Sequence, residues 1–258
     1  RNFFLENAAA LMGEQLTLGA IFIPLAISFY TFEQIALLVD VQDGKAGKPA
    51  FEDFATYVVL FPHLIAGPIV LFREMGPQFE KLRRGDFPDL SLFGPGLVVF
   101  LFGLFKKVAI ANNLAPYVDT AFAAPSLTLL EAWAAAIGYG LQLYFDFSGY
   151  SDMAVGLALM LGFVLPINFD TPYRATSMID FWKRWHITLT NFITTYVYTP
   201  ILRSLGRVTF GKSLWAILLA MFLSGIWHGA GWTFVVWGTL HALALVVNHL
   251  WRKKKLKM

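Results

Sequence analysis

The stretch Leu223-Ser224-Gly225-Ile226-Trp227-His228-Gly229-Ala230-Gly231-Trp232 places one titratable side chain between two apolar segments, Ser213–Trp227 and Thr233–Trp251. Each segment is long enough to lie within a lipid bilayer. Ionisable groups at bilayer depth cost at least a few kcal/mol, so a histidine there is a functional candidate. The alternative is an interfacial histidine that is hydrogen-bonded to a carbonyl. The flanking glycines favour function, because glycine lets backbone and substrate approach closely.

Composition indicates a membrane protein. The chain is 57% hydrophobic and 14% charged, whereas soluble domains have roughly 45–50% and 25%. Its mean hydropathy is +0.59, and its many aromatic residues suit lipid-facing helices and interfacial belts. The absence of cysteine excludes disulfides, thiolate nucleophiles and Cys-ligated zinc. No HExxH motif, ligand cluster or Gly-rich phosphate loop occurs, so we expect no metal and no bound cofactor.

Basic residues lie in short clusters between apolar runs, which is the positive-inside pattern rather than a nucleic-acid-binding one. Residues 203–212 and 252–257 are both rich in Lys and Arg, so both should be cytoplasmic and the two C-terminal helices should form a hairpin. His228 follows Lys212 by 16 residues, or about 24 Å of helix. That places His228 beyond the midplane of a hydrocarbon core about 30 Å thick, where a cytoplasmic donor could reach it through a tunnel and an acceptor from the other side.

Earlier apolar runs predict further spanning helices. Leu16–Val39 is interrupted by Pro24, which predicts a kink, and Leu92–Ala111 carries Lys106 and Lys107 near its end, where they could snorkel to the headgroups. Leu127–Phe147 and Tyr150–Leu165 are separated only by Ser148-Gly149. That short link indicates either a tight hairpin or one long bent helix.

Two stretches depart from simple spans. Phe54–Phe72 is broken by Pro62-His63 and Gly67-Pro68, which predicts a broken or re-entrant helix with His63 in a structural role. Phe181–Ile201 is aromatic and amphipathic, which favours an interfacial helix. The predicted fold is therefore an all-α, polytopic transmembrane protein with broken or re-entrant helices around an internal tunnel. We expect a single core over residues 1–258, or a shortened form of a longer protein, without a signal peptide.

His186 ends the run Phe181-Trp182-Lys183-Arg184-Trp185-His186. It is either an exposed residue of an amphipathic helix or part of a site in which the neighbouring cations bind an anionic donor. Asp180 lies six residues before His186 and would not face it on a regular helix. A salt bridge from Asp180 to Arg184, at i,i+4, is the favoured role for this carboxylate.

Asp146 and Asp152 bracket Ser148-Gly149 inside an apolar region. Carboxylates at that depth are costly unless they are paired or hydrated. They either line a cavity, pair structurally, or cap the following helix, for which Ser148 and Asp152 have suitable side chains. Glu33, inside the first apolar run, carries the same ambiguity.

Several sequence blocks resemble the membrane-bound O-acyltransferases, in particular the bacterial branch that includes the alginate O-acetylation membrane protein. The blocks run through most of the chain in the order of that family. They are Phe61-Pro62-His63-Leu64-Ile65-Ala66-Gly67-Pro68-Ile69-Val70, Tyr144-Phe145-Asp146-Phe147-Ser148-Gly149-Tyr150-Ser151-Asp152-Met153-Ala154, Asn168-Phe169-Asp170-Thr171-Pro172-Tyr173, Phe181-Trp182-Lys183-Arg184-Trp185-His186-Ile187-Thr188-Leu189 and Gly225-Ile226-Trp227-His228-Gly229-Ala230.

The resemblance implies that His228 is the essential histidine of the family and His186 its second histidine, with the acyl donor arriving from the cytoplasm. We expect transfer of a short acyl group, such as acetyl from acetyl-CoA or another acyl thioester, toward a hydroxyl of an extracytoplasmic polysaccharide. His228 would act as general base, and His186 would polarise the thioester, orient the donor or stabilise an oxyanion. The expected substrate-binding residues are Trp182, Arg184, Trp185, Trp227 and Asp152.

The expected setting is the inner (cytoplasmic) membrane, crossed several times, with the lipid bilayer and an extracytoplasmic acyltransferase protein as partners and no nucleic acid. Other functions stay open at this stage. The chain could be a D-alanyl or lipid acyltransferase of the same family, or an ion- or proton-coupled transporter that uses Asp146 and Asp152. A third possibility is a non-catalytic scaffold that docks a periplasmic partner.

Overall fold

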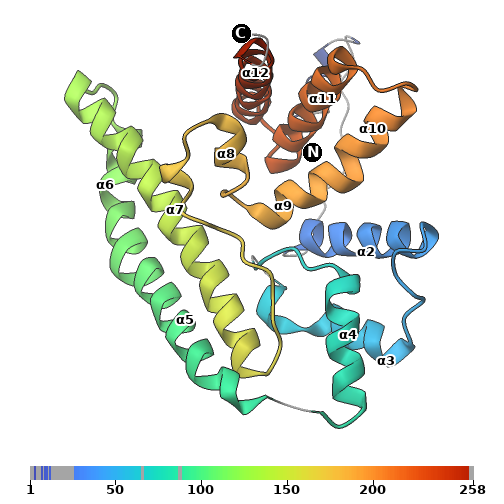
Figure 1. Cartoon of the computed structure of the whole chain (residues 1–258). Helices are drawn as coiled ribbons and strands as arrows, with labels where there is room; N and C mark the ends of the chain where they lie inside the picture. Colours follow the sequence, from blue (N-terminus) through green and yellow to red (C-terminus); the bar gives the residue numbers. More distant parts are fainter. Residues whose placement is uncertain are drawn as a thin grey trace. The chain divides into compact units, whose positions relative to one another are not determined.

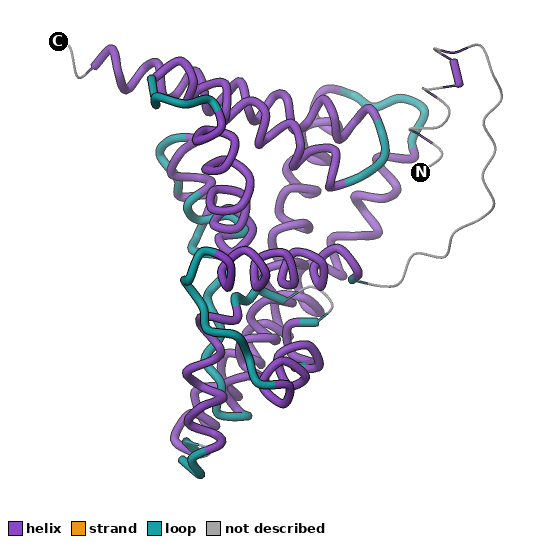
Figure 2. Tube along the Cα trace, turned by 90° about the vertical axis from the view of Figure 1, so that its right-hand side faces the viewer, coloured by secondary structure: helices purple, strands orange, loops and turns teal. Residues whose placement is uncertain are grey.

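A computed structural model describes residues 26–64, 67–86 and 89–255, together with Phe3, Asn7, Ala9, Ala10 and Met12. In this described part every regular element is a helix (Figures 1 and 2), which confirms the all-α prediction. The chain divides into two compact units: unit 1 comprises residues 1–24, 171–185 and 189–258, and unit 2 comprises residues 25–170 and 186–188. The expectation of a single core over residues 1–258 stays a prediction.

Unit 2 is built on a long helix, α7 (Leu129–Met160). The helix begins with a capping box in which the Glu131 amide donates to Thr128 Oγ1 and the Glu131 carboxylate accepts from the Thr128 amide. It then continues without interruption through Ser148-Gly149. Of the two expected arrangements, the single long helix is therefore confirmed. The suggested capping role of Ser148 and Asp152 is wrong, because no helix begins there.

Glycine pairs bring α7 against α5 (Phe93–Phe105), beside which it runs in Figure 1. A Cβ atom on Gly103 would lie 2.5 Å from the carbonyl oxygen of Gly149, and one on Gly96 would lie 2.8 Å from that of Gly156. Small residues at a membrane helix interface allow such close approach of two backbones. Glycine is a poor helix former, but at Gly149 the missing side chain makes room for α5.

After α5 the helix continues through a π-helical turn, η3 (Lys106–Ala111), into α6 (Asn112–Ala123). The Lys106 ammonium lies 2.5 Å from the Asp152 carboxylate, and the Lys107 ammonium pairs with Asp146. Both lysines thus pair with carboxylates of α7, and the suggestion that they could snorkel to the headgroups stays a prediction. For Asp146 and Asp152 the structural-pairing alternative is confirmed.

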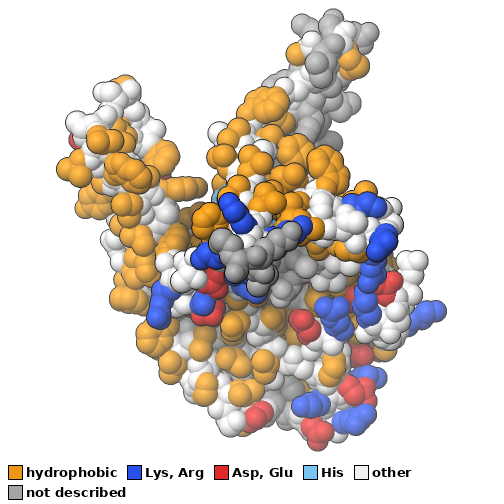
Figure 3. Space-filling view, turned by 45° about the horizontal axis from the view of Figure 1, so that its top comes forward, with side chains coloured by type: hydrophobic (Ala, Val, Ile, Leu, Met, Phe, Trp, Pro, Cys, Tyr) orange, Lys and Arg blue, Asp and Glu red, His pale blue; other side chains and the backbone are white. Residues whose placement is uncertain are grey.

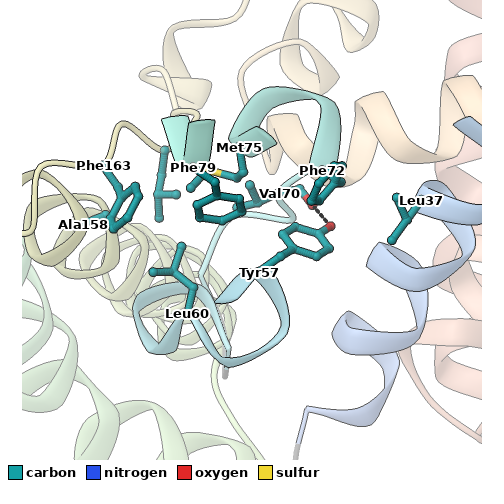
Figure 4. Close-up of a cluster of buried hydrophobic side chains, with 10 residues drawn as sticks. Leu37, Tyr57, Leu60, Val70, Phe72, Met75, Phe79, Ala158 and Phe163 are labelled. Carbon is teal, nitrogen blue, oxygen red and sulfur yellow. Dashed lines mark hydrogen bonds between the residues drawn. The ribbon is translucent and has the colours of Figure 1, made fainter. Parts of the chain in front are cut away.

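The remainder of unit 2 packs into a hydrophobic core of buried residues (Figure 4). Its elements are α2 (Ile27–Gln42), α3 (Phe51–Val59), the short 3₁₀ helix η1 (Phe61–His63), α4 (Phe72–Arg83) and, before α5, η2 (Leu90–Leu92). The expected break in Phe54–Phe72 is confirmed: α3 ends at Val59, and residues 68–71 form no regular element before α4 begins. The Tyr57 hydroxyl donates to the Val70 carbonyl at 2.7 Å across this break.

Unit 1 contains the expected hairpin of α11 (Phe210–His228) and α12 (Trp232–Lys255). The Thr209 hydroxyl caps α11 by accepting from the Lys212 amide. A Cβ atom on Gly225 would lie 2.6 Å from the Phe234 carbonyl oxygen and 2.9 Å from Gly238 Cα, so these two helices also approach closely. Before the hairpin lie η4 (Pro172–Arg174) and α8 (Met178–Trp182), and then α9 (Ile187–Phe192), η5 (Ile193–Tyr198) and α10 (Thr199–Ser204), which follow one another as a continuous helical run. The predicted helix Phe181–Ile201 is therefore interrupted, because residues 183–186 are not helical.

Three helices of the described part are long and apolar enough to cross a membrane: Leu90–Ala123, Phe210–His228 and Trp232–Lys255. The first is the continuous run from η2 to α6, on which large apolar side chains such as Leu101, Phe102 and Phe105 are exposed. Hydrophobic side chains also cover much of the face drawn in Figure 3. The N-terminal portion of the predicted span Leu16–Val39, including Pro24, lies outside the described residues.

Candidate functional site

His228 is the last residue of α11, and Gly229 follows it at the start of the link to α12. Its exposed ring lies 4.7 Å from the Trp227 ring and 4.8 Å from the Trp237 ring, measured between ring centroids. The angle between the His228 and Trp237 planes is 79°, an edge-to-face contact. Aromatic edge-to-face pairs favour one relative orientation, so the two indoles set the direction of the imidazole.

The same indole connects His228 to a second histidine. The Trp237 and His241 rings are 4.7 Å apart, and the Trp182 ring is 5.3 Å from His241 and 6.0 Å from Trp237. We call the set of five rings the Trp–His cluster: Trp182, Trp227, His228, Trp237 and His241. Sequence reasoning missed Trp237 and His241, although their i,i+4 spacing on α12 puts them on one helix face.

Two buried nitrogen atoms of the cluster, Trp182 Nε1 and His241 Nδ1, have no hydrogen-bond partner among the described residues. A buried polar group without a partner costs about 1–3 kcal/mol. Such groups are retained where a ligand or a water supplies the missing partner. The part of the cluster formed by Trp182 and His241 is therefore chemically suited to bind a polar group.

A cavity of about 300 Å³ in unit 1 shares Trp182 with the Trp–His cluster. Its wall is mostly apolar and includes Ile217, Met221 and Leu245, while Lys183 and His249 supply basic groups. This is the composition expected of a site for a chain-like ligand that carries an anionic group.

His186 belongs to unit 2, where it is 3% exposed. Its Nδ1 lies 3.0 Å from Asn168 Oδ1, and the Phe147 ring stands perpendicular to the imidazole, with 4.7 Å between the ring centroids. The backbone of His186 has φ of +43°, a left-handed conformation that costs a non-glycine residue of order 1–3 kcal/mol and is typical of functional sites. The alternative of an exposed residue on an amphipathic helix is therefore wrong for His186.

Asn168 holds the whole segment 186–188. Its backbone carbonyl accepts from the Ile187 amide at 2.9 Å, and its side-chain oxygen accepts from the Thr188 amide and hydroxyl. Sequence reasoning quoted Asn168 within a motif but assigned it no role. Its side-chain partners lie 17 to 20 residues away along the chain, so no local pattern could identify them.

Four of the expected substrate-binding residues belong to unit 1, and Asp152 belongs to unit 2. In unit 1, Arg184 pairs with Asp180 at 2.9 Å, as predicted, and Trp185 stacks on Phe181 at 5.6 Å. The Arg184 side chain, and secondly the Thr176 amide, donate to Asp180 and hold the pKa of that carboxyl below its usual 3.8. Trp182 and Trp227 belong to the Trp–His cluster, whereas Asp152, in unit 2, pairs with Lys106.

A second buried polar pair in unit 2 joins His63 and Glu33, whose Nδ1 and Oε1 atoms are 2.9 Å apart. The same Glu33 oxygen accepts from the Val70 amide at 3.2 Å. Glu33 is thus paired, and His63 has the structural role expected of it. Among the described residues, no group of three or more His, Asp or Glu side chains is arranged to hold a metal ion.

Comparison with known proteins agrees with the motifs. The family model "MBOAT, membrane-bound O-acyltransferase family" matches residues 44–254. A peptidoglycan O-acetyltransferase of Helicobacter pylori is 40% identical over 96% of this chain and 51% of its own length. The "Probable alginate O-acetylase AlgI" of Azotobacter vinelandii is 43% identical over 93% of this chain and 47% of its own length. A teichoic acid D-alanyltransferase of Streptococcus thermophilus is 27% identical over 90% of this chain and 58% of its own length.

The chain spans about half the length of these relatives. The family model, however, covers well over half of the chain, and it contains the motif blocks at residues 61–70, 144–154, 168–173, 181–189 and 225–230. The chain therefore belongs to the membrane-bound O-acyltransferase family.

Proposed function

We propose that this protein is a membrane O-acyltransferase that moves a short acyl group, acetyl above all, from a thioester donor toward a hydroxyl of an extracytoplasmic polysaccharide. The observation that carries the proposal is the setting of His228 in a chain of this family. The imidazole is exposed, it is oriented by Trp227 and Trp237, and it stands at the end of a predicted membrane helix.

In the proposed reaction His228 acts as general base. A hydroxyl is a poor nucleophile at neutral pH, so an imidazole nitrogen that takes its proton as attack begins lowers the barrier. The hydroxyl oxygen bonds to the thioester carbonyl carbon, and the C–S bond then breaks. The proton on His228 passes to the departing sulfur, so that the products are an ester and a free thiol.

The donor is proposed to be acetyl-CoA or another acyl thioester that arrives from the cytoplasm. Support comes from the cavity beside Trp182, because its apolar wall suits an extended thioester arm and Lys183 suits an anionic group. The positive-inside pattern places the ends of α11 and α12 that carry Lys212 and Lys253 on the cytoplasmic side. The proposed location is accordingly the inner membrane.

The acceptor is proposed to be a polysaccharide, reached with an extracytoplasmic acyltransferase as partner protein. Relatives at 40–43% identity are named for O-acetylation of peptidoglycan or alginate, which favours acetyl as the transferred group. The D-alanyltransferase relatives are 27% identical. D-alanyl is therefore the second candidate for that group.

The test is acyl transfer from radiolabelled acetyl-CoA in membranes that contain the protein and its polysaccharide acceptor. We expect His228→Ala to lower the rate at least 10²-fold, the lower range for loss of a general base, without changing the unfolding temperature. Leu223→Ala, which alters an exposed side chain of the same helix, is the matched control and should retain the wild-type rate. A His228→Ala rate within threefold of the wild type contradicts the proposal.

The transporter alternative predicts a different pattern. A proton-coupled transporter would lose function on Asp146→Asn or Asp152→Asn rather than on His228→Ala. The pairing of both carboxylates with lysines gives them a structural role instead. Measuring acyl transfer for these two variants beside His228→Ala separates the two classes of protein.

A further inference from the structure

A network of buried hydrogen bonds in unit 2 contains two backbone amides, which can only donate, and these fix the roles of the other groups. The Ile69 amide lies 3.0 Å from Thr188 Oγ1, and Thr188 Oγ1 lies 2.9 Å from Asn168 Oδ1. A backbone amide can only donate, so Thr188 Oγ1 accepts from Ile69. Its own hydroxyl proton then points to Asn168.

The orientation of the Asn168 amide follows from a second backbone group. The Thr188 amide is 3.3 Å from Asn168 Oδ1 and must donate to it, so this atom is the carbonyl oxygen rather than the nitrogen. The other terminal atom, Nδ2, donates to Ser151 Oγ at 3.1 Å. Asn168 and Ser151 are 2% and 1% exposed, so water does not compete for these bonds.

His186 Nδ1 meets the same Asn168 oxygen at 3.0 Å. Because a carbonyl oxygen only accepts, Nδ1 must carry the proton. In a neutral imidazole with the proton on Nδ1, the other nitrogen, Nε2, is the acceptor. The left-handed backbone of His186 and the perpendicular Phe147 ring favour this orientation of the imidazole.

We infer that Asn168 is a positioning residue that fixes the proton of His186 on Nδ1, so that His186 meets a substrate through a hydrogen-bond acceptor. This inference rests on the proposed function. It selects among the roles considered for His186: a neutral ring with this tautomer orients an O–H or N–H group of a substrate, whereas stabilising an oxyanion would require a proton on Nε2. Asn168 itself need not touch the substrate.

The first test reads the tautomer directly, by ¹⁵N NMR of the full chain in lipid nanodiscs with histidine labelled on the ring. His186 is assigned by the signal missing from His186→Gln. We expect a protonated Nδ1 and an unprotonated Nε2 for the wild type at neutral pH. A protonated Nε2 overturns the inference, and since no substrate is present, the result does not depend on the proposed reaction.

The second test uses variants. We expect Asn168→Ala to give a mixture of tautomers and a kcat lower by about 10²-fold, a loss in the range typical of an impaired acid–base group, with KM within threefold. Thr188→Val is the matched control, because it removes another bond to the same oxygen but leaves the His186 partner in place. It should keep the wild-type tautomer.

A double-mutant cycle separates positioning from general support of the fold. If Asn168 acts through His186, adding Asn168→Ala to His186→Ala should lower kcat no further. If the two losses multiply, Asn168 acts independently of His186 and the inference is wrong. A wild-type protein that shows the expected tautomer but transfers no acyl group from any thioester contradicts the proposed function alone.

Discussion

Replacing Gly103 by alanine should destabilise the protein although alanine is the better helix former. The added Cβ atom would lie 2.5 Å from the Gly149 carbonyl oxygen and 2.6 Å from the Met153 amide nitrogen, both backbone atoms of α7. Ordinary van der Waals contact begins at 3.4 Å, so the two backbones must separate by about 0.9 Å. A gap of that size loses a quarter to a half of the dispersion energy of each affected contact.

The net effect is a difference between two terms. Overpacking of this kind costs about 1–3 kcal/mol, while exchanging glycine for alanine inside a helix contributes about 1 kcal/mol of stability. The expected net loss is therefore up to about 2 kcal/mol. For a chain of this size that corresponds to a decrease in Tm of up to about 8 °C.

The assay is thermal unfolding of the purified protein in detergent, followed by tryptophan fluorescence. Gly94→Ala is the control, because it lies on the same helix and a Cβ atom there meets nothing within 4 Å. It should leave Tm unchanged or raise it slightly. A Gly103→Ala protein that unfolds at or above the temperature of Gly94→Ala would refute the close-packing argument.

Two further predictions concern charged pairs. Asp152→Asn removes the partner of Lys106, whose side chain is 26% exposed, and should lower the unfolding free energy by about 1–3 kcal/mol. Asp43→Asn, in the exposed pair with Lys45, is the control and should lower it by less than about 1 kcal/mol. Equal losses of the two variants in urea unfolding would contradict the structural role of the Lys106–Asp152 pair. The lowered pKa of Asp180 contributes stability that is fully present above its unfolded value of 3.8 and is lost as pH falls through the folded pKa. The difference in Tm between wild type and Asp180→Asn should thus be largest near neutral pH and vanish at pH values well below 3.8, and a difference that grows on acidification would exclude this explanation.

Local patterns predicted the features that depend on neighbours in the chain. Prolines and glycine marked the break between α3 and α4, because they disrupt hydrogen bonding within a helix. The i,i+4 spacing predicted the Asp180–Arg184 pair, and the basic clusters predicted the α11–α12 hairpin. The family motifs identified His186 and His228 as the candidate catalytic histidines.

The features that were missed depend on contacts between distant segments. The partners of Asn168, Lys106 and Glu33 lie 17 to 46 residues away, and periodicity carries no information about them. Gly149 shows the converse difficulty. The low helix propensity of glycine favours an interruption of the helix, but α7 continues through Gly149 because it packs there against α5.

The length of the helix that includes α5 has a consequence for how the protein responds to its lipids. Leu90–Ala123 contains 34 residues, or about 51 Å at 1.5 Å per residue, whereas the hydrocarbon core is about 30 Å thick. Such a helix must tilt or protrude into the headgroups and water. Gly96 and Gly103 hold this helix against α7, so the two helices have to tilt together. A change in membrane thickness should therefore change the tilt of both helices at once.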